Sequence, residues 1–336
     1  MRAAVIREPQ KALVMEDRPK PKPGQGQVVI KIKACGVCHS DLFVQQHAFG
    51  FEQYPVVPGH EVAGVVDEVG PGVNWPAVGD RVGMPWLYSS CGHCKYCVSG
   101  NEILCREGQV TGVTIDGGYA EYMLAPAAFV APIPDALDFA DAAPLMCAGL
   151  TVYNGLRNAK YAVGQKVAVI GMGGLGHLAI LFAKAMAGRV AVISTSSDKE
   201  KEARAMGAEK FINAKEEDVV EALRGWDGGP DIILATAPNV ASMTKAFPGL
   251  AADGTMVVLG ADAGAIQVTP MDLISGRRKL LGSPSGGRSD IRATLEFAAA
   301  HGVRPVITKF PLERANDVLE SMHNGTLRNR AVLMME

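Results

Sequence analysis

The sequence predicts an α/β protein with two domains, an antiparallel, barrel-like β domain and a doubly wound parallel sheet covered by helices. The chain has 336 residues, which is enough for two hydrophobic cores. Residues 1–147 consist of short β-rich runs separated by Pro and Gly. In residues 148–285 strand-like and helix-like segments alternate, which indicates βαβ units. We expect residues 286–336 to return to the first domain.

The expected strands of the first domain are short. The N-terminal run MRAAVIREP is interpreted as a strand and not as a signal peptide, because it has no apolar h-region. Further strands of this domain are expected at 27–34, 61–69, 80–84 and 121–124.

The second domain is expected to open with the apolar strand KVAVI at 166–170 and a helix rich in small residues at 174–187. A second strand and a charged helix follow at 190–194 and 198–206. Strands at 231–235 and 255–259 complete the expected alternation, and the returning segment is expected to hold a helix at 290–301 and a strand at 330–335.

The composition is that of a globular protein and excludes several classes. Hydrophobic residues make up 48% and charged residues 20%, unlike a disordered or fibrous chain. Thirty-three basic against 35 acidic residues leave a net charge of -2, so neither nucleic acid nor an anionic membrane is an expected partner. The sequence contains no run of 18 apolar residues, so no membrane-spanning helix is predicted. Without an export signal we expect a cytoplasmic protein, whose seven cysteines need a purpose other than disulfides.

Four of these cysteines, Cys91, Cys94, Cys97 and Cys105, form a C-x2-C-x2-C-x7-C row. Thiolates at this spacing can converge on one ion, and four of them complete the tetrahedral shell of a structural zinc. An iron–sulfur cluster is the rival interpretation, but no Pro follows the fourth cysteine and the chain is not a short ferredoxin. The plain alternative is four unliganded surface thiols.

Three further candidate ligands, Cys38, His60 and Cys147, lie far apart in the sequence. Two thiolates and one imidazole leave the fourth position of a zinc ion open, as a catalytic zinc requires. Each alone is a weak signal, since a lone buried cysteine is usually a small hydrophobic residue. The run CGVCH at 35–39 also matches a haem attachment motif and a redox pair, but neither an export signal nor a βαβ unit accompanies it. Cys35 is then surplus and is expected to pack within or at the end of its strand.

A glycine-rich loop follows the strand KVAVI and opens the next helix. The first glycine allows the tight turn, the second lets a pyrophosphate approach the backbone, and the third lets helix and strand pack closely. The helix N-terminus then offers NH groups and a positive dipole to the phosphates. A tight turn without a ligand is the alternative. The loop residues expected to bind the cofactor are Gly171, Gly173, Gly174, Leu175 and Gly176.

The end of the second strand indicates which nicotinamide cofactor is used. An NAD enzyme usually has Asp or Glu there to bind the adenosine ribose. This chain has Ser194, followed by Thr195, Ser196 and, after Asp198, Lys199. Small hydroxyls and one cation offer donors without a carboxylate to repel a 2′-phosphate, so NADP(H) is expected in preference to NAD(H). Asp198 weakens the argument, and NAD(H) stays possible.

Over nearly its full length the chain resembles the zinc-dependent medium-chain alcohol dehydrogenases. The resemblance implies a GroES-like catalytic domain at 1–147 and 286–336 and a Rossmann cofactor domain at 148–285. It also implies two zinc ions per chain and a homodimer or homotetramer. The cysteine row resembles the bacterial and yeast branch, and the segment ISTSSDKEKEARAMGA resembles the NADP-using cinnamyl-alcohol branch. The motifs that carry the resemblance are CGVCHSD, PGHEVAGVV, GDRVGMPWLYSSCGHCKYC, GGYAEY, LMCAGLTVY and GMGGLGHLAILFAKAM.

The resemblance also implies roles for single residues. It assigns the catalytic zinc to the three dispersed candidates, with Glu61 close by as an occasional ligand. Ser40 corresponds to the hydroxyl that takes the substrate's proton, and Asp41 to the carboxylate that orients His60. For the cofactor it implies pyrophosphate contacts from His39 and Arg330, a position near the nicotinamide for Thr151, and a 2′-phosphate pocket of Ser194, Thr195 and Lys199.

The predicted activity is hydride transfer between NADP(H) and a primary alcohol or aldehyde. The alternatives are an NAD-dependent enzyme of the same fold acting on short alcohols, and a zinc-stabilised nucleotide-binding protein without turnover. One departure from the family is Phe43, where many relatives have a His that passes the proton to solvent. Either His47 replaces that group or the proton leaves through water.

Overall fold

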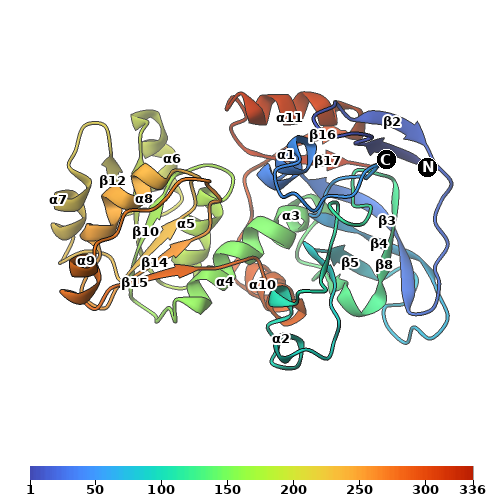
Figure 1. Cartoon of the computed structure of the whole chain (residues 1–336), viewed down its shortest axis with the longest axis horizontal. Helices are drawn as coiled ribbons and strands as arrows, with labels where there is room; N and C mark the ends of the chain where they lie inside the picture. Colours follow the sequence, from blue (N-terminus) through green and yellow to red (C-terminus); the bar gives the residue numbers. More distant parts are fainter. Residues whose placement is uncertain (336) are drawn as a thin grey trace. The chain divides into compact units, whose positions relative to one another are not determined.

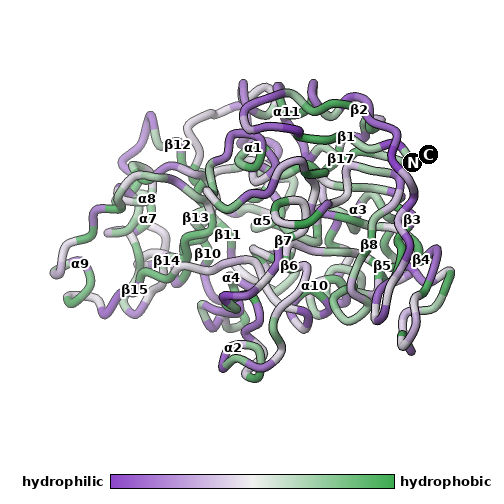
Figure 2. Tube along the Cα trace, turned by 45° about the vertical axis from the view of Figure 1, so that its right-hand side comes forward, coloured by the Kyte–Doolittle hydropathy of each residue, from purple (hydrophilic) through white to green (hydrophobic). Residues whose placement is uncertain are grey.

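The computed structural model of the chain describes residues 1–335 and divides into two compact units (Figure 1). The first unit comprises Met1–Leu150 and the chain from Gly286 onward, and the second comprises Thr151–Ser285. Each unit has its own sheet, and the expected α/β class is confirmed. Figure 2 shows hydrophobic stretches in green along the strands and hydrophilic stretches in purple mainly in the loops. Within residues 1–335 no helix is long and apolar enough to cross a membrane.

The first unit is built on a seven-stranded sheet in the order β16-β17-β3-β4-β5-β9, with β8 also paired to β3. All its pairs are antiparallel except β16 with β17. The long strand β3 is rich in β-branched residues and buries most of its side chains, which suits a central strand. The strands are β3 (Gln27–Gly36), β4 (Val62–Val69), β5 (Arg81–Met84), β8 (Tyr122–Pro126), β9 (Ala131–Pro132), β16 (Ile307–Pro311) and β17 (Arg330–Met334).

Two smaller pairs and several short helices complete this unit. The N-terminal run forms β1, which pairs with β2, and β6 pairs with β7 next to the cysteine row. A π-helical turn, Leu145–Gly149, follows α3 directly. These elements are β1 (Arg2–Val5), β2 (Val14–Asp17), β6 (Leu87–Ser89), β7 (Gln109–Val110), α1 (His39–Gln46), α2 (Lys95–Val98), α3 (Phe139–Pro144), α10 (Arg288–His301) and α11 (Ala315–His323).

The second unit is a doubly wound sheet of six parallel strands in the order β12-β11-β10-β13-β14-β15. The inner strands are continuous apolar runs buried along their length, as expected of a parallel sheet covered on both faces. Its strands are β10 (Lys166–Ile170), β11 (Arg189–Ser194), β12 (Lys210–Asn213), β13 (Ile232–Ala235), β14 (Thr255–Val258) and β15 (Lys279–Gly282). Its helices are α4 (Leu150–Asn158), α5 (Gly176–Ala185), α6 (Glu200–Ala205), α7 (Val219–Arg224), α8 (Val240–Ala246) and α9 (Pro270–Ile274).

The sequence patterns misjudged one helix and missed seven strands, namely β2, β6, β7, β9, β12, β15 and β16. The strands β12, β15 and β16 are short and include charged residues, so no apolar run marks them. The helix expected at 198–206 begins as a 3-10 turn at Ser197–Lys199 and becomes α-helical only at Glu200.

Candidate active site and metal centres

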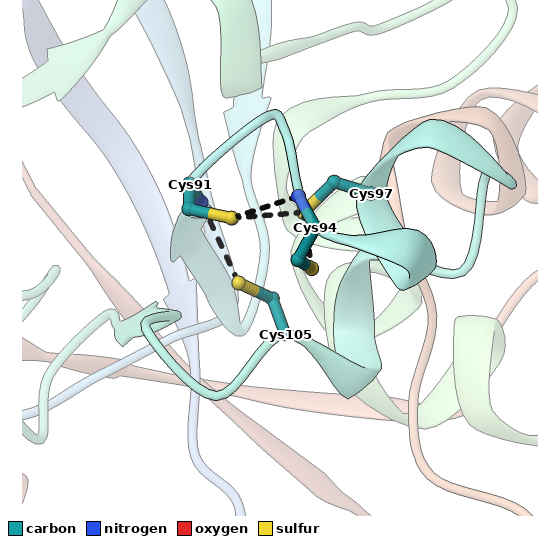
Figure 3. Close-up of side chains that lie close together, drawn as sticks. All are labelled: Cys91, Cys94, Cys97 and Cys105. Carbon is teal, nitrogen blue, oxygen red and sulfur yellow. Dashed lines mark hydrogen bonds between the residues drawn. The ribbon is translucent and has the colours of Figure 1, made fainter.

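The four cysteines of the row lie on a loop of short elements after β6 (Figure 3). Cys91 and Cys94 are separated by a turn, Cys97 lies on α2, and Cys105 follows a 3-10 turn at Glu102–Leu104. Their four sulfur atoms lie within 4.8 Å of one another. Sγ of Cys97 is 3.8 Å from that of Cys91 and 3.5 Å from that of Cys94.

Backbone NH groups and a hydroxyl point at these sulfurs. The amide of Cys94 donates to Cys91 Sγ at 3.3 Å, and the amide of Cys91 donates to Cys105 Sγ at 3.5 Å. The Ser90 hydroxyl, 3.3 Å from Cys97 Sγ, is the main cause that lowers the pKa of Cys97 to about 6. Four converging free thiols fit a structural zinc.

An ion pair between the buried Glu102 and the exposed Arg288 attaches this loop to α10. Glu102, with 5% of its surface exposed, accepts from the backbone NH of Arg288 at 3.1 Å and from its Nε at 2.8 Å. Arg288 also lies over the Phe129 ring, 4.7 Å from its centroid. Neither residue stood out in the sequence, because the two are 186 positions apart.

A second cluster brings together Cys38, His60, Glu61 and Cys147, whose ligand atoms all lie within 4.8 Å of one another. Cys38 is the N-cap of α1, His60 and Glu61 directly precede β4, and Cys147 lies in the π-helical turn. His60 is fully buried, and its Nε2 has no hydrogen-bond partner among residues 1–335. A buried nitrogen without a partner beside two thiols fits a zinc ion that would use its lone pair.

Asp41 organises this cluster. Its buried carboxylate lies 3.1 Å from His60 Nδ1, and it accepts from the amides of Cys38 at 2.8 Å and Gly59 at 3.2 Å. The Tyr119 hydroxyl donates to the same carboxylate at 3.0 Å. Burial raises the pKa of Tyr119 well above its usual value, which keeps the phenol protonated as a donor. Sequence reasoning missed Tyr119, whose only signal was the GGYAEY motif.

Glu61 is held by Arg330 in the buried interior. A guanidinium NH of Arg330 donates to Glu61 Oε1, while Glu61 Oε2 has no partner in the described part of the chain. Burial raises the pKa of Glu61 to about 7, and the Arg330 charge offsets this only in part. A Cβ at Gly36 would lie 1.9 Å from Glu61 Oε2, so glycine is needed there to make room for the carboxylate.

Aromatic rings surround the second cluster. Trp86 packs edge-on against His60 with ring centroids 4.9 Å apart, and Phe49 lies 5.7 Å from Trp86. Phe43 contacts both Phe49, at 5.8 Å, and His39, at 5.6 Å. Phe49 was not recognised in the sequence. These rings give the surroundings of the cluster an apolar character.

In the second unit, the glycine loop lies between β10 and α5, as predicted. Gly171 has a φ of +89°, which requires glycine. A Cβ at Gly176 would lie 2.1 Å from the Gly171 carbonyl oxygen, so helix and strand pack too closely for a side chain. Nothing lies within 4 Å of a Cβ built on Gly173, which leaves the backbone open to a ligand. These three environments fit a dinucleotide pyrophosphate.

The segment after β11 approaches this loop. Ser194 is buried, and its Oγ accepts from the Ser196 amide at 3.3 Å. The Lys199 ammonium donates to the Met172 carbonyl in the glycine loop at 3.5 Å, and the Ser196 hydroxyl donates to Asp198. Other predicted cofactor residues are distributed over both units, Thr195 and Thr151 in the second and His39 and Arg330 in the first.

Together, a β domain with a four-thiolate centre and a Cys/His/Glu centre, and a parallel-sheet domain with a dinucleotide loop, define a zinc-dependent nicotinamide oxidoreductase. Residues 24–135 match the alcohol dehydrogenase GroES-like domain, and residues 174–300 match the zinc-binding dehydrogenase family. An alcohol dehydrogenase of Geobacillus stearothermophilus is 41% identical over 337 residues, covering 100% of both chains. The chain belongs to the zinc-containing medium-chain alcohol dehydrogenase family.

Solved structures agree with this assignment. A cinnamyl alcohol dehydrogenase of Sorghum bicolor superposes with a TM-score of 0.90 at 32% identity, covering 100% of this chain and 99% of that one. A structure titled CAD from Helicobacter pylori, complexed with NADP(H), gives a TM-score of 0.88 at 28% identity over 100% and 99% of the two chains. The chain is therefore an NAD(P)-dependent zinc alcohol dehydrogenase, with an alcohol or aldehyde as its substrate.

Proposed function

We propose that the enzyme prefers NADP(H) and interconverts primary alcohols and aldehydes. The observation that carries the cofactor preference is the environment at the end of β11. Ser194 takes the place where an acidic residue would bind the ribose of NAD, and Lys199 brings its charge to the glycine loop. The NADP(H) complex of the Helicobacter pylori relative supports the same preference.

The proposed roles of the residues around the zinc follow from their contacts. Bound by Cys38, His60 and Cys147, a zinc ion supplies Lewis-acid polarisation of the substrate oxygen. Ser40 is proposed to accept the substrate's hydroxyl proton, which is supported by its Oγ lying 3.8 Å from Cys38 Sγ.

Two carboxylates are proposed to support that chemistry without accepting the proton. Asp41 keeps the His60 ring in one orientation, so that Nε2 faces the cluster. Glu61, paired with Arg330, stays available as an occasional ligand. His39, Thr151 and Arg330 are proposed to contact the cofactor.

The Lys199→Ala substitution tests the cofactor preference. We expect kcat/KM for NADPH to fall about 10- to 100-fold, since a charge-assisted hydrogen bond contributes about 1.5–3 kcal/mol. The value for NADH should change less than about twofold, because NADH lacks the 2′-phosphate that the ammonium would bind. Steady-state kinetics with both cofactors measures this difference.

Lys201→Ala is the matched control, because Lys201 is an exposed lysine on the adjacent helix α6 and is not one of the predicted pocket residues. It should leave both values unchanged. A larger kcat/KM for NADH than for NADPH in the unaltered enzyme would contradict the preference. That result would favour the NAD-dependent alternative, which Asp198 beside Ser196 supports.

Because residue 43 is Phe and not a proton-accepting His, we expect proton release to limit the rate of alcohol oxidation in a pH-dependent way. His47 lies at the far end of α1 from Ser40, and its Nδ1 is 2.9 Å from the buried carboxylate of Glu52, so it is poorly placed to replace the missing base. Phe43→His should add a group that takes up a proton with an ordinary pKa of about 6.5. We expect oxidation near pH 7 to become about tenfold faster, which is less than an evolved general base contributes.

The pH–rate profile of oxidation, compared with that of Phe43→Gln, measures this effect. The glutamine variant matches the polarity without a titrating ring, so it should not show the new dependence. If the profiles of Phe43→His and the parent coincide, proton release does not limit the reaction at this position.

The homodimer or homotetramer and the cytoplasmic location stay predictions. The oligomeric state is what the family resemblance implies. Light scattering on the purified enzyme would measure the oligomeric state.

A further inference from the structure

Two exposed side chains lie at the rim of the four-thiolate centre. A ring nitrogen of His93, a carboxylate oxygen of Glu107 and Cys91 Sγ lie within 4.8 Å of one another. Cys91 is also one of the four clustered sulfurs. The two groups of possible ligands therefore share one thiol, and the outer group is open to solvent.

The His93 ring is already oriented. Its Nδ1 lies 2.9 Å from the Cys91 carbonyl oxygen, to which it donates when protonated. In that tautomer Nε2 keeps its lone pair. Metal-binding histidines commonly donate their other ring NH to a carbonyl or carboxylate in this way. Because this contact uses Nδ1, Nε2 is the ring nitrogen left to bind a metal.

Glu107 lies next to two cysteines of the four-thiolate centre. It lines one surface hollow together with Cys94 and Cys105. Cys97, by contrast, is buried with 9% of its surface exposed. Of the residues in the two groups, His93 and Glu107 are the most exposed, so they are open to an ion from solvent while Cys97 is not.

We propose that Cys91, His93 and Glu107 form an outer zinc site through which the ion enters and leaves the four-thiolate centre. Nitrogen, carboxylate oxygen and thiolate are the ligands that zinc uses in proteins. Transfer inward then replaces the imidazole, the carboxylate and one bound water by the thiolates of Cys94, Cys97 and Cys105. Cys91 stays bound throughout, and the thiol protons pass to water.

This path has a kinetic signature. Zinc that enters through the outer site also leaves through it. Loss of that site therefore lowers the rate constants of zinc entry and zinc release by the same factor. The equilibrium affinity of the inner centre depends only on its end states and is unchanged. A residue that merely holds the loop in place would instead change the amount of zinc bound and the thermal stability.

The test measures exchange of bound zinc for isotopically enriched zinc by native mass spectrometry, and release of zinc to a chromogenic chelator. The variants are His93→Gln, Glu107→Gln and the double variant, all in the intact enzyme. Repeating each measurement in a Cys38→Ser background identifies the phase that belongs to the four-thiolate centre. We expect that phase to slow roughly tenfold or more in both directions, with zinc content and melting temperature unchanged.

Lys95→Ala and Val98→Ala are the controls. Lys95 lines the same hollow, so its removal tests the effect of charge alone, and Val98 is an exposed apolar residue of the same loop. His93→Gln keeps a polar side chain of similar length and removes the imidazole ligand. Unchanged exchange rates in the double variant would overturn the proposal. A lower zinc content with faster release would also overturn it, since the two residues would then hold the inner centre together.

Discussion

Replacing Cys38 by serine should lower kcat/KM for alcohol oxidation by about 1000-fold or more, which corresponds to a barrier increase of about 4 kcal/mol. The thiol is one of the groups converging on the buried Nε2 of His60, and its loss leaves too few ligands to retain the ion. Zinc should fall from two ions per chain to one, as measured by metal analysis alongside the kinetics. The four-thiolate centre lies elsewhere in the unit, so the fold and the second zinc should remain.

Cys35→Ala is the matched control for this substitution. Cys35 is a fully buried thiol near the end of β3, close to Cys38 in the sequence, but it belongs to none of the possible ligand groups. Replacing it by alanine should leave a small cavity that lowers the stability by about 1–2 kcal/mol. The zinc content should not change. Equal losses of zinc from the two variants would contradict the assignment of Cys38 as a ligand.

Replacing Cys97 by serine should destabilise the first unit. The loop around the four sulfurs exposes Val98 and Leu104, with 72% and 46% of their surfaces accessible, so apolar burial contributes little to its order. A lost metal site is among the few causes of stability losses of about 4 kcal/mol. At about 2–4 °C per kcal/mol for a unit of this size, the melting temperature should fall by about 8–16 °C.

Thermal unfolding followed by circular dichroism, with metal analysis of the same samples, measures this loss. Val98→Ala is the control on the same loop and should leave both readings unchanged. A Cys97→Ser enzyme that kept its second zinc and its melting temperature would rule out a stabilising role for the four-thiolate centre.

Features that depend on local spacing could be predicted from the sequence. The cysteine row could be recognised because sulfurs a few residues apart on a tight loop must come close together. The glycine loop could be recognised because Gly171 and Gly176 meet steric limits set by the strand–turn–helix unit itself. Cys38, His60 and Cys147 were candidates by residue type, but they became predicted ligands only with the glycine loop and the family resemblance, because no local geometry connects them.

The tertiary structure alone decided the contacts that link distant segments. Tyr119 donates to Asp41 across 78 positions, and Arg330 pairs with Glu61 across 269. Glu102 accepts from the backbone NH of Arg288, at the start of α10, across 186 positions. Each pair depends on sheet register and helix docking, which place side chains from remote segments within hydrogen-bonding distance. The physical reason is that a buried polar group must find a partner, and folding of the whole unit decides which partner is within reach.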